Sequence, residues 1–133
     1  MTSCGVDRHT GQPLRGWPHV AQSIGVILST RIGSRVMRRV FGSDVPQLLG
    51  ENLTERTILR FVTAIIVAIE LWEPRFKVKR VDVGASNTAE RLRAGRFAFR
   101  IIGEYRPRGH QGDPTPEGGE RVFTYNPSGA LTA

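Results

Sequence analysis

Two acidic side chains near the middle of the chain have a spacing from which hydrolytic chemistry could be built. Glu70 and Glu73 are three residues apart, so a helix would place both carboxyl groups on one face. Glycoside hydrolases use two carboxyl groups about 5–10 Å apart, one on either side of the bond that they cleave. Arg75, however, would keep the nearby Glu73 ionised and therefore poor as an acid. Solvated or ion-paired glutamates are the simpler interpretation, and we expect no catalytic residue and no enzyme.

The histidines and the cysteine give little support to a metal site or a nucleophile. His9, His19 and His110 stand in three separate segments, and Cys4 is the single cysteine. Zinc sites draw their ligands from short, regular spacings, which these residues lack. One thiol cannot form an internal disulfide, so a reducing compartment is favoured. We therefore expect no metal and no cofactor.

Positive charge dominates the composition. Lys and Arg number 19 against 12 Asp and Glu, a formal net charge of +7 over 133 residues. The basic residues gather in three groups: Arg31, Arg35, Arg38 and Arg39; Lys77, Lys79 and Arg80; Arg91, Arg93, Arg96 and Arg100. Such charge suits an acidic partner, whether nucleic acid, an anionic membrane or a protein. Helices followed by a basic hairpin could form a winged helix, so a nucleic-acid-binding protein is one alternative hypothesis.

Neither end nor middle of the chain predicts a membrane segment. The N-terminal stretch is polar and lacks the apolar core of a signal peptide. The longest apolar run, residues 61–69, is far shorter than the roughly 18 residues that a membrane span requires. We therefore expect no membrane partner.

Helices come first in the predicted order of elements. Apolar residues recur at helical spacing after Trp17-Pro18, and this pattern fades at Ser29. Residues 33–50 predict a loop and a short helix that ends at Gly50. A long helix follows from Asn52 to Trp72, with Asn52 as its expected cap and Thr54 as the competing one. Its polar stripe is so narrow that a sheet or a partner chain must cover most of its sides.

Strands follow the long helix. Pro74 ends that helix, because the residue before a proline avoids the helical conformation. Alternation slips in phase after Val78, which predicts a bulge near Lys79-Arg80 in the first strand. A second strand places Phe97, Phe99 and Ile101 on one face. Residues 120–125 could form a third strand or an arm that a partner orders.

The expected fold is therefore α+β, with N-terminal helices, one long central helix, and an antiparallel β-hairpin or small three-stranded sheet. Residues 1–105 would form the domain. Residues 106–133 would form a flexible Gly/Pro-rich loop and a C-terminal arm. The edge of so small a sheet invites a further strand from a partner.

Several stretches resemble one family in the same order along the chain. They are Gly5 to Asp7 with Gly11, Gln22-Ser23-Ile24, Ile27-Leu28-Ser29-Thr30, Gly33-Ser34-Arg35-Val36-Met37, Phe41-Gly42-Ser43 and Leu48-Leu49. Glu73-Pro74-Arg75 follows at the end of the long helix. This series, over residues 5 to about 105, resembles the baseplate assembly protein W family of contractile phage tails. The same baseplate wedge component is also called the sheath initiator.

The resemblance implies a structural protein of the virion baseplate, assembled in the host cytoplasm with six copies around the tail axis. It implies binding to baseplate wedge proteins and to the tail sheath protein, whose strands would add to the sheet and start sheath polymerisation. Contact with the tail tube or hub is a further expectation, and nucleic acid is not expected. Some members carry a lysozyme label, so a cell-wall-degrading enzyme is a third hypothesis.

The partner-binding residues that we expect are Glu73, Pro74, Arg75, Phe97, Phe99, Ile101 and Arg35. An arginine fork can hold a carboxylate and nearby carbonyls together. We hypothesise that Glu73 and Arg75 either fix the angle between helix and strand or clamp a wedge partner. The sequence leaves open whether they pair with each other.

Overall fold

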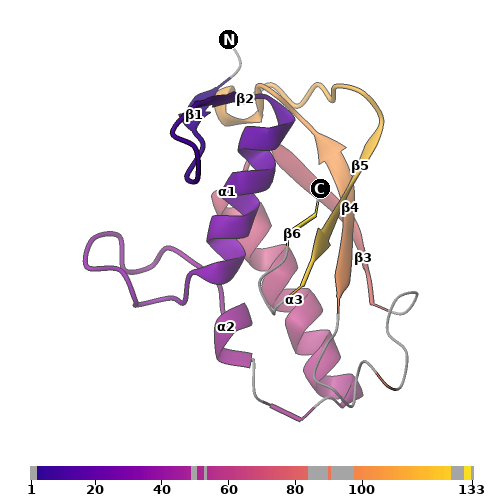
Figure 1. The fold of residues 1–133 in the computed structure, drawn as a ribbon. Helices are drawn as coiled ribbons and strands as arrows, with labels where there is room; N and C mark the ends of the chain where they lie inside the picture. The colour runs from indigo at the N-terminus through magenta and orange to yellow at the C-terminus, as the bar shows by residue number, and fades with distance from the viewer. Residues whose placement is uncertain are drawn as a thin grey trace.

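A layer of helices covers one face of an antiparallel sheet (Figure 1). The structure is a computed structural model that describes residues 3–48, 51–52, 54–83, 90, 98–126 and 131–132. The helices are α1 (Trp17–Ser29), α2 (Val45–Leu48) and α3 (Glu55–Trp72). The main sheet follows them in the chain, which confirms the predicted α+β class.

Helices α1 and α2 form where the apolar spacing predicted them. Pro18 occupies the first turn of α1, where its missing N–H costs no hydrogen bond. The buried face of α1 carries Val20, Ile24 and Leu28. Helix α2 is the short helix expected within residues 33–50, and Gly50, its expected end, lies outside the described residues.

Thr54, rather than Asn52, caps the long helix α3. The Thr54 hydroxyl accepts a hydrogen bond from the backbone N–H of Thr57 at 3.3 Å. The expected Asn52 cap is wrong because the helix begins at Glu55, so Asn52 stands outside the capping position.

Within the described part of the chain, α3 is buried on one side and exposed on the other. Phe61, Ile65 and Ile69 are buried in the core. Leu59 and Leu71 remain 67% and 66% exposed on the opposite side. The sequence predicted cover on most sides, and the described residues supply that cover only in part.

The main sheet has the strand order β3-β4-β5-β6, with every neighbouring pair antiparallel. Its strands are β3 (Phe76–Asp82), β4 (Phe99–Tyr105), β5 (Glu120–Tyr125) and β6 (Leu131–Thr132). The register shifts between Val78 and Arg80, which confirms the predicted bulge. Strand β5 pairs along β4, so residues 120–125 are the third strand and not a detached arm.

Aromatic side chains join the helical layer to the sheet. The rings of Phe61 on α3 and Phe99 on β4 lie 5.5 Å apart. Trp17 at the start of α1 lies 5.5 Å from Phe76 on β3. Phe123 brings β5 into the same core. Among the described residues, no helix combines the length and the apolar character needed to cross a bilayer.

A small hairpin precedes α1. Its strands are β1 (Cys4–Val6) and β2 (Pro13–Arg15). The Asp7 carboxylate accepts hydrogen bonds from the backbone N–H groups of His9 and Thr10, which stabilises the turn. These hydrogen bonds lower the pKa of Asp7. Gln22 of α1 accepts a hydrogen bond from the backbone N–H of Arg8 and donates one to the carbonyl of Val6, so the hairpin is held against α1.

Candidate functional site

Glu73 and Arg75 form a buried, two-pronged ion pair at the junction of α3 and β3. Arg75 Nε lies 2.6 Å from Glu73 Oε1, and Arg75 Nη2 lies 2.8 Å from Glu73 Oε2. Their exposed fractions are 1% for Glu73 and 8% for Arg75. This parallel geometry is the strong, directional form of an arginine–carboxylate contact. The question that the sequence left open is therefore answered: the two residues pair with each other.

The third nitrogen of the Arg75 guanidinium reaches the N-terminal hairpin and α1. Nη1 lies 2.9 Å from Nδ1 of His19 and also donates to the hydroxyl of Ser3. Because a guanidinium can only donate, Nδ1 of His19 must accept and is unprotonated. Burial, with the nearby positive charge of Arg75, lowers the pKa of His19.

Sequence patterns did not indicate the residues that surround Arg75. Ser3 and His19 are 72 and 56 residues from Arg75 in the chain. Gly5 packs directly against the imidazole of His19. A Cβ at position 5 would lie only 2.3 Å from Nε2, so a larger residue there would displace the ring. The presence of Gly5 among the family-like stretches was the one available signal.

The segment after β4 covers Pro74. A Cβ on Gly109 would lie 2.1 Å from the Pro74 carbonyl oxygen, so only glycine allows this approach. The backbone N–H of Arg106 donates to the carbonyl of Arg75 at 2.7 Å. A short 3₁₀ helix, Gly109–Gln111, follows. The sequence predicted a flexible loop from residue 106 onward, and the structure gives the first part of that loop defined contacts with the Glu73–Arg75 junction.

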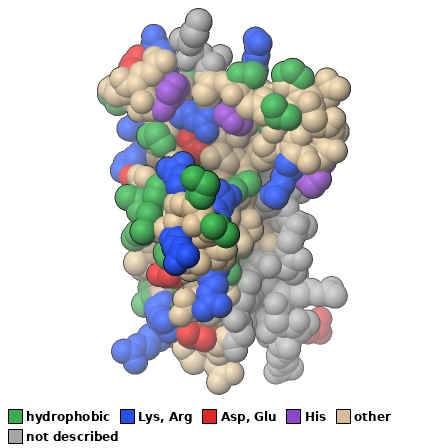
Figure 2. Space-filling model, turned by 90° about the vertical axis from the view of Figure 1, so that its left-hand side faces the viewer, with side chains coloured by type: hydrophobic (Ala, Val, Ile, Leu, Met, Phe, Trp, Pro, Cys, Tyr) green, Lys and Arg blue, Asp and Glu red, His purple; other side chains and the backbone are tan. Residues whose placement is uncertain are grey.

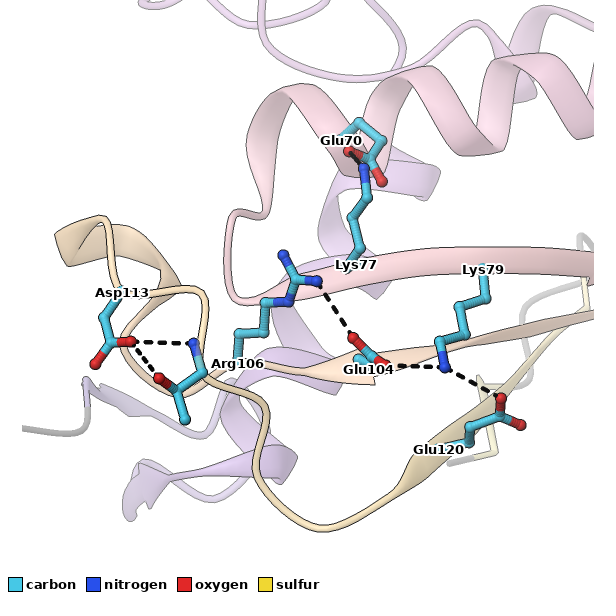
Figure 3. A network of polar contacts seen from close by, with 8 residues as sticks. Glu70, Lys77, Lys79, Glu104, Arg106, Asp113 and Glu120 are labelled. Carbon is cyan, nitrogen blue, oxygen red and sulfur yellow. Dashed lines mark hydrogen bonds and ion pairs between the residues drawn. The ribbon is translucent and has the colours of Figure 1, made fainter.

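Charged side chains on α3 and on strands β3, β4 and β5 form further ion pairs. Figure 3 shows Lys77 reaching Glu70, and Lys79 lying between Glu104 and Glu120 on neighbouring strands. Hydrogen bonds from Lys79 and, to a smaller extent, from Arg106 lower the pKa of Glu104. The predicted second basic group is therefore largely matched by acidic side chains of the same chain.

Glu70 and Glu73 do not form a free carboxyl pair. Glu70 is bound by Lys77 at 2.7 Å, whereas Glu73 is held by Arg75 in the protein interior. Within the part of the chain that the structure describes, no group of three or more His, Cys, Asp or Glu residues is placed to hold a metal ion.

Arg35 lies away from the Glu73–Arg75 pair, in the segment between α1 and α2. Its guanidinium carbon stands 4.4 Å above the ring of Phe41. Phe41 in turn meets Trp72 edge to face, with ring centres 5.1 Å apart. Arg35 is thus connected through the ring of Phe41 to Trp72, the last residue of α3 and the neighbour of Glu73.

The expected strand residues lie inside the molecule. Phe99 and Ile101 are fully buried on β4, which pairs with β3 on one side and β5 on the other. Phe97 lies outside the described residues, as do Arg91, Arg93 and Arg96 of the third basic group. The free edges of the sheet therefore belong to other strands than β4.

Comparison with known proteins places this fold among contractile-tail components. The chain is 33% identical over 105 residues to baseplate protein W of Escherichia phage P2, which covers 79% of this chain and 86% of that protein. A chain of the post-contraction pyocin R2 baseplate is 30% identical, with a TM-score of 0.65 over 78% of this chain and 99% of that chain. A Geobacter sulfurreducens protein named as a candidate tail lysozyme is 27% identical, with a TM-score of 0.61 over 81% and 86% of the two chains.

Fold and relatives thus define a baseplate component of contractile, tail-like particles. The family described as baseplate wedge protein gp25 matches residues 15–109, and the chain belongs to it. Its place is the baseplate of the virion or tail particle. The resemblance found in the sequence is confirmed.

Proposed function

We propose that this baseplate protein initiates the tail sheath by accepting strands of the sheath protein on the edge of its sheet. The observation that carries the proposal is the incomplete cover of β5. In the described part of the sheet, β6 pairs only with Thr124 and Tyr125. The outer edge of β5 from Glu120 to Phe123 therefore has backbone groups available for another strand.

The opposite edge of the sheet is the weaker acceptor. Strand β3 pairs with β4 on one side, and its other side is an edge. The register shift between Val78 and Arg80 interrupts the regular spacing of its backbone groups. Phe99 and Ile101 would act indirectly in strand addition. Their packing in the core holds β4 in place, and β4 in turn positions β5. A role for Phe97 stays a prediction.

We further infer that Glu73, Pro74 and Arg75 act by fixing the angle between α3 and β3. Both charged groups are buried and already paired, so they have little surface to offer a partner. Removing Arg75 would leave the Glu73 carboxylate buried without a partner. The resulting disorder at the junction would disturb whatever surface the baseplate recognises.

The work of the protein in this proposal is assembly and not hydrolysis. The lysozyme hypothesis needs a carboxyl acid close to a second carboxylate. Glu73 is paired with Arg75 and Glu70 with Lys77, so neither is available in that role. The nucleic-acid hypothesis is weakened because Lys77 and Lys79 of the second basic group are already paired with acidic side chains. Their partners are Glu70, Glu104 and Glu120.

The assembly that we propose has six copies around the tail axis, bound to wedge proteins and to the first ring of sheath. Contact with the tail tube or hub would follow from that position. The baseplate family supports this arrangement, because its members work in contractile tails.

The test places a photo-crosslinking residue at Val122 on β5 in cells that produce the particle. Cross-links to the sheath protein are expected there. The same cross-linking residue at Val6, an exposed apolar position on the N-terminal hairpin, is the control.

A capture experiment tests the same proposal. A tagged chain should retain wedge and sheath proteins at about 1 M salt, where the Debye length is roughly 3 Å and contacts that depend on charge alone are lost. Loss of both at that salt, with nucleic acid bound only at low salt, would refute the proposal.

A second arm of the test replaces Arg75. Arg75→Ala is expected to abolish incorporation into baseplates, counted by electron microscopy of purified particles. Arg108→Ala is the matched control, because Arg108 is an exposed arginine paired with Asp113 on the surface. Normal incorporation of Arg75→Ala would show that the junction has no part in assembly.

A further inference from the structure

A groove runs along the uncovered side of α3. It lies between α3 and residues 32–48, with a volume of about 540 Å³. Ile32 and Val40 line one wall, and Leu59, Val67 and Leu71 line the other. Figure 2 shows the side of the molecule from which the segment between α1 and α2 projects, and hydrophobic side chains lie among Lys and Arg there. The proposed edge of β5 belongs to a different layer of the fold.

The α3 wall of the groove has the form that a second helix requires. Leu59, Thr63, Val67 and Leu71 are spaced four residues apart, which places them in one row along the helix. This row extends about 18 Å, at 1.5 Å per residue. Rows of side chains four apart are the ridges that fit into the grooves of a neighbouring helix. Val67, at the middle, is 57% exposed.

The segment between α1 and α2 extends the apolar surface beyond the groove. It projects from the helical layer (Figure 1), and Val36 and Met37 in it are 88% and 81% exposed. Phe41 holds the segment against Trp72 of α3. Arg38 has a positive φ of 54°, a strained conformation outside glycine, and its guanidinium stands over the Trp72 ring. The projection is therefore held to α3 at its base.

The charges around this surface are strongly one-sided. Arg56 lines the groove, and four further arginines belong to the segment between α1 and α2: Arg31, Arg35, Arg38 and Arg39. None of these five has an ion pair among the described residues. Arg60 is paired with Glu51 at 2.7 Å. Asp44 is the acidic residue among those that line the groove. A partner that complements this rim must carry negative charge.

We propose that the groove binds an acidic amphipathic helix of another baseplate protein. The apolar face of that helix would pack on the row from Leu59 to Leu71, and its carboxylates would meet the arginines. A second copy of this chain fits less well, because its net charge of +7 repels a like copy. Many of its own carboxylates are also already paired, among them Glu70, Glu73, Glu104 and Asp113.

This inference rests on membership in the baseplate family and not on strand addition to β5. The first experiment places a photo-crosslinking residue at Val67 in cells that produce the particle, and identifies the cross-linked peptides by mass spectrometry. The expected product joins Val67 to a single segment of another baseplate protein, with apolar residues at helical spacing and Asp or Glu between them. Val6 is again the control position and should not yield that segment.

The second experiment tests the charge. Arg31→Glu combined with Arg39→Glu should lower the yield of the Val67 cross-link about tenfold or more, since it places like charges opposite each other. Neither guanidinium takes part in the ring contacts of Phe41 and Trp72, so the fold should survive, which circular dichroism will verify. Exchanging the acidic residues of the cross-linked segment for Lys should restore the yield.

Several outcomes would overturn the inference. They are a Val67 cross-link to a second copy of this chain, to nucleic acid or to a segment without acidic residues, and the absence of any cross-link above the Val6 control. Sheath cross-links at Val122 without a helical partner at Val67 would refute the groove while leaving the sheath proposal intact. The reverse pattern would refute strand addition alone.

Discussion

The carboxylate of Glu73 and the guanidinium of Arg75 face each other around Pro74, with contacts of 2.6 and 2.8 Å. Pro74 ends α3, and the ion pair connects the C-cap of that helix, Glu73, to the residue before β3, Arg75. The remaining nitrogen of Arg75 contacts His19 on α1. One arginine therefore joins both long helices to the sheet.

Arg75→Ala should lower the free energy of unfolding by about 3–5 kcal/mol, because it leaves a buried carboxylate without its partner. Urea denaturation followed by circular dichroism measures the change. The control is the double variant Glu73→Leu with Arg75→Met, which removes both charges and should recover much of the loss. A loss below about 1 kcal/mol for Arg75→Ala would mean that the pair behaves as a surface salt bridge.

The stability of the protein should fall as the pH drops below about 6.5, the ordinary pKa of histidine. Burial and Arg75 lower the pKa of His19 in the folded state, so the unfolded chain binds this proton more readily. The contribution of His19 to stability is therefore fully present above the unfolded-state pKa. It is lost as the pH falls from that value to the lower pKa of the folded state. Urea midpoints at pH 7.5 and 5.5 measure the effect.

His19→Gln should flatten the pH dependence of stability in that interval. His110→Gln is the control, because His110 is exposed in the 3₁₀ helix and should leave the dependence unchanged. The lowered pKa values of Asp7 and Asp113 act in a separate range, since stability from carboxylates is lost only as the pH falls below about 4. An unchanged slope in His19→Gln would show that His19 is not the group that titrates.

Phe123→Ala should destabilise the protein by about 3–5 kcal/mol, because β5 contributes this ring to the core. Val122→Ala is the matched control on the same strand. Val122 is partly exposed, so its truncation should cost less than about 1 kcal/mol. Equal small effects in urea denaturation would mean that β5 is an accessory arm and not a strand of the folded domain.

Thr54→Ala should cost about 1 kcal/mol, because it removes the side-chain acceptor for the Thr57 N–H at the start of α3. Asn52→Ala should change stability by no more than about 0.5 kcal/mol. Thermal unfolding of the two variants measured side by side compares the two caps. A larger loss for Asn52→Ala would return the capping role to that residue.

Local patterns predicted much of the fold. The helices α1 and α3 and the bulge in β3 each follow from spacing within one segment, since helical and strand periodicities are properties of neighbouring residues. For residues 120–125 the sequence left a third strand and an arm as alternatives, and the pairing of β5 with β4 decides for the strand. The family resemblance likewise rests on short stretches in a fixed order. The cap of α3 was predicted less well, because Asn52 and Thr54 both have suitable side chains and the first helical turn decides between them.

The sequence by itself determined the order of the elements, the break at Pro74 and the residues that would carry the junction. Only the tertiary structure decided that Glu73 pairs with Arg75, and that His19 and Ser3 complete the site from 56 and 72 residues away. It also decided that β5 pairs along β4, that the core between helices and sheet buries Phe99 and Ile101, and that one side of α3 stays open in the described residues. Contacts between distant segments depend on how layers pack, and local periodicity carries no information about that packing.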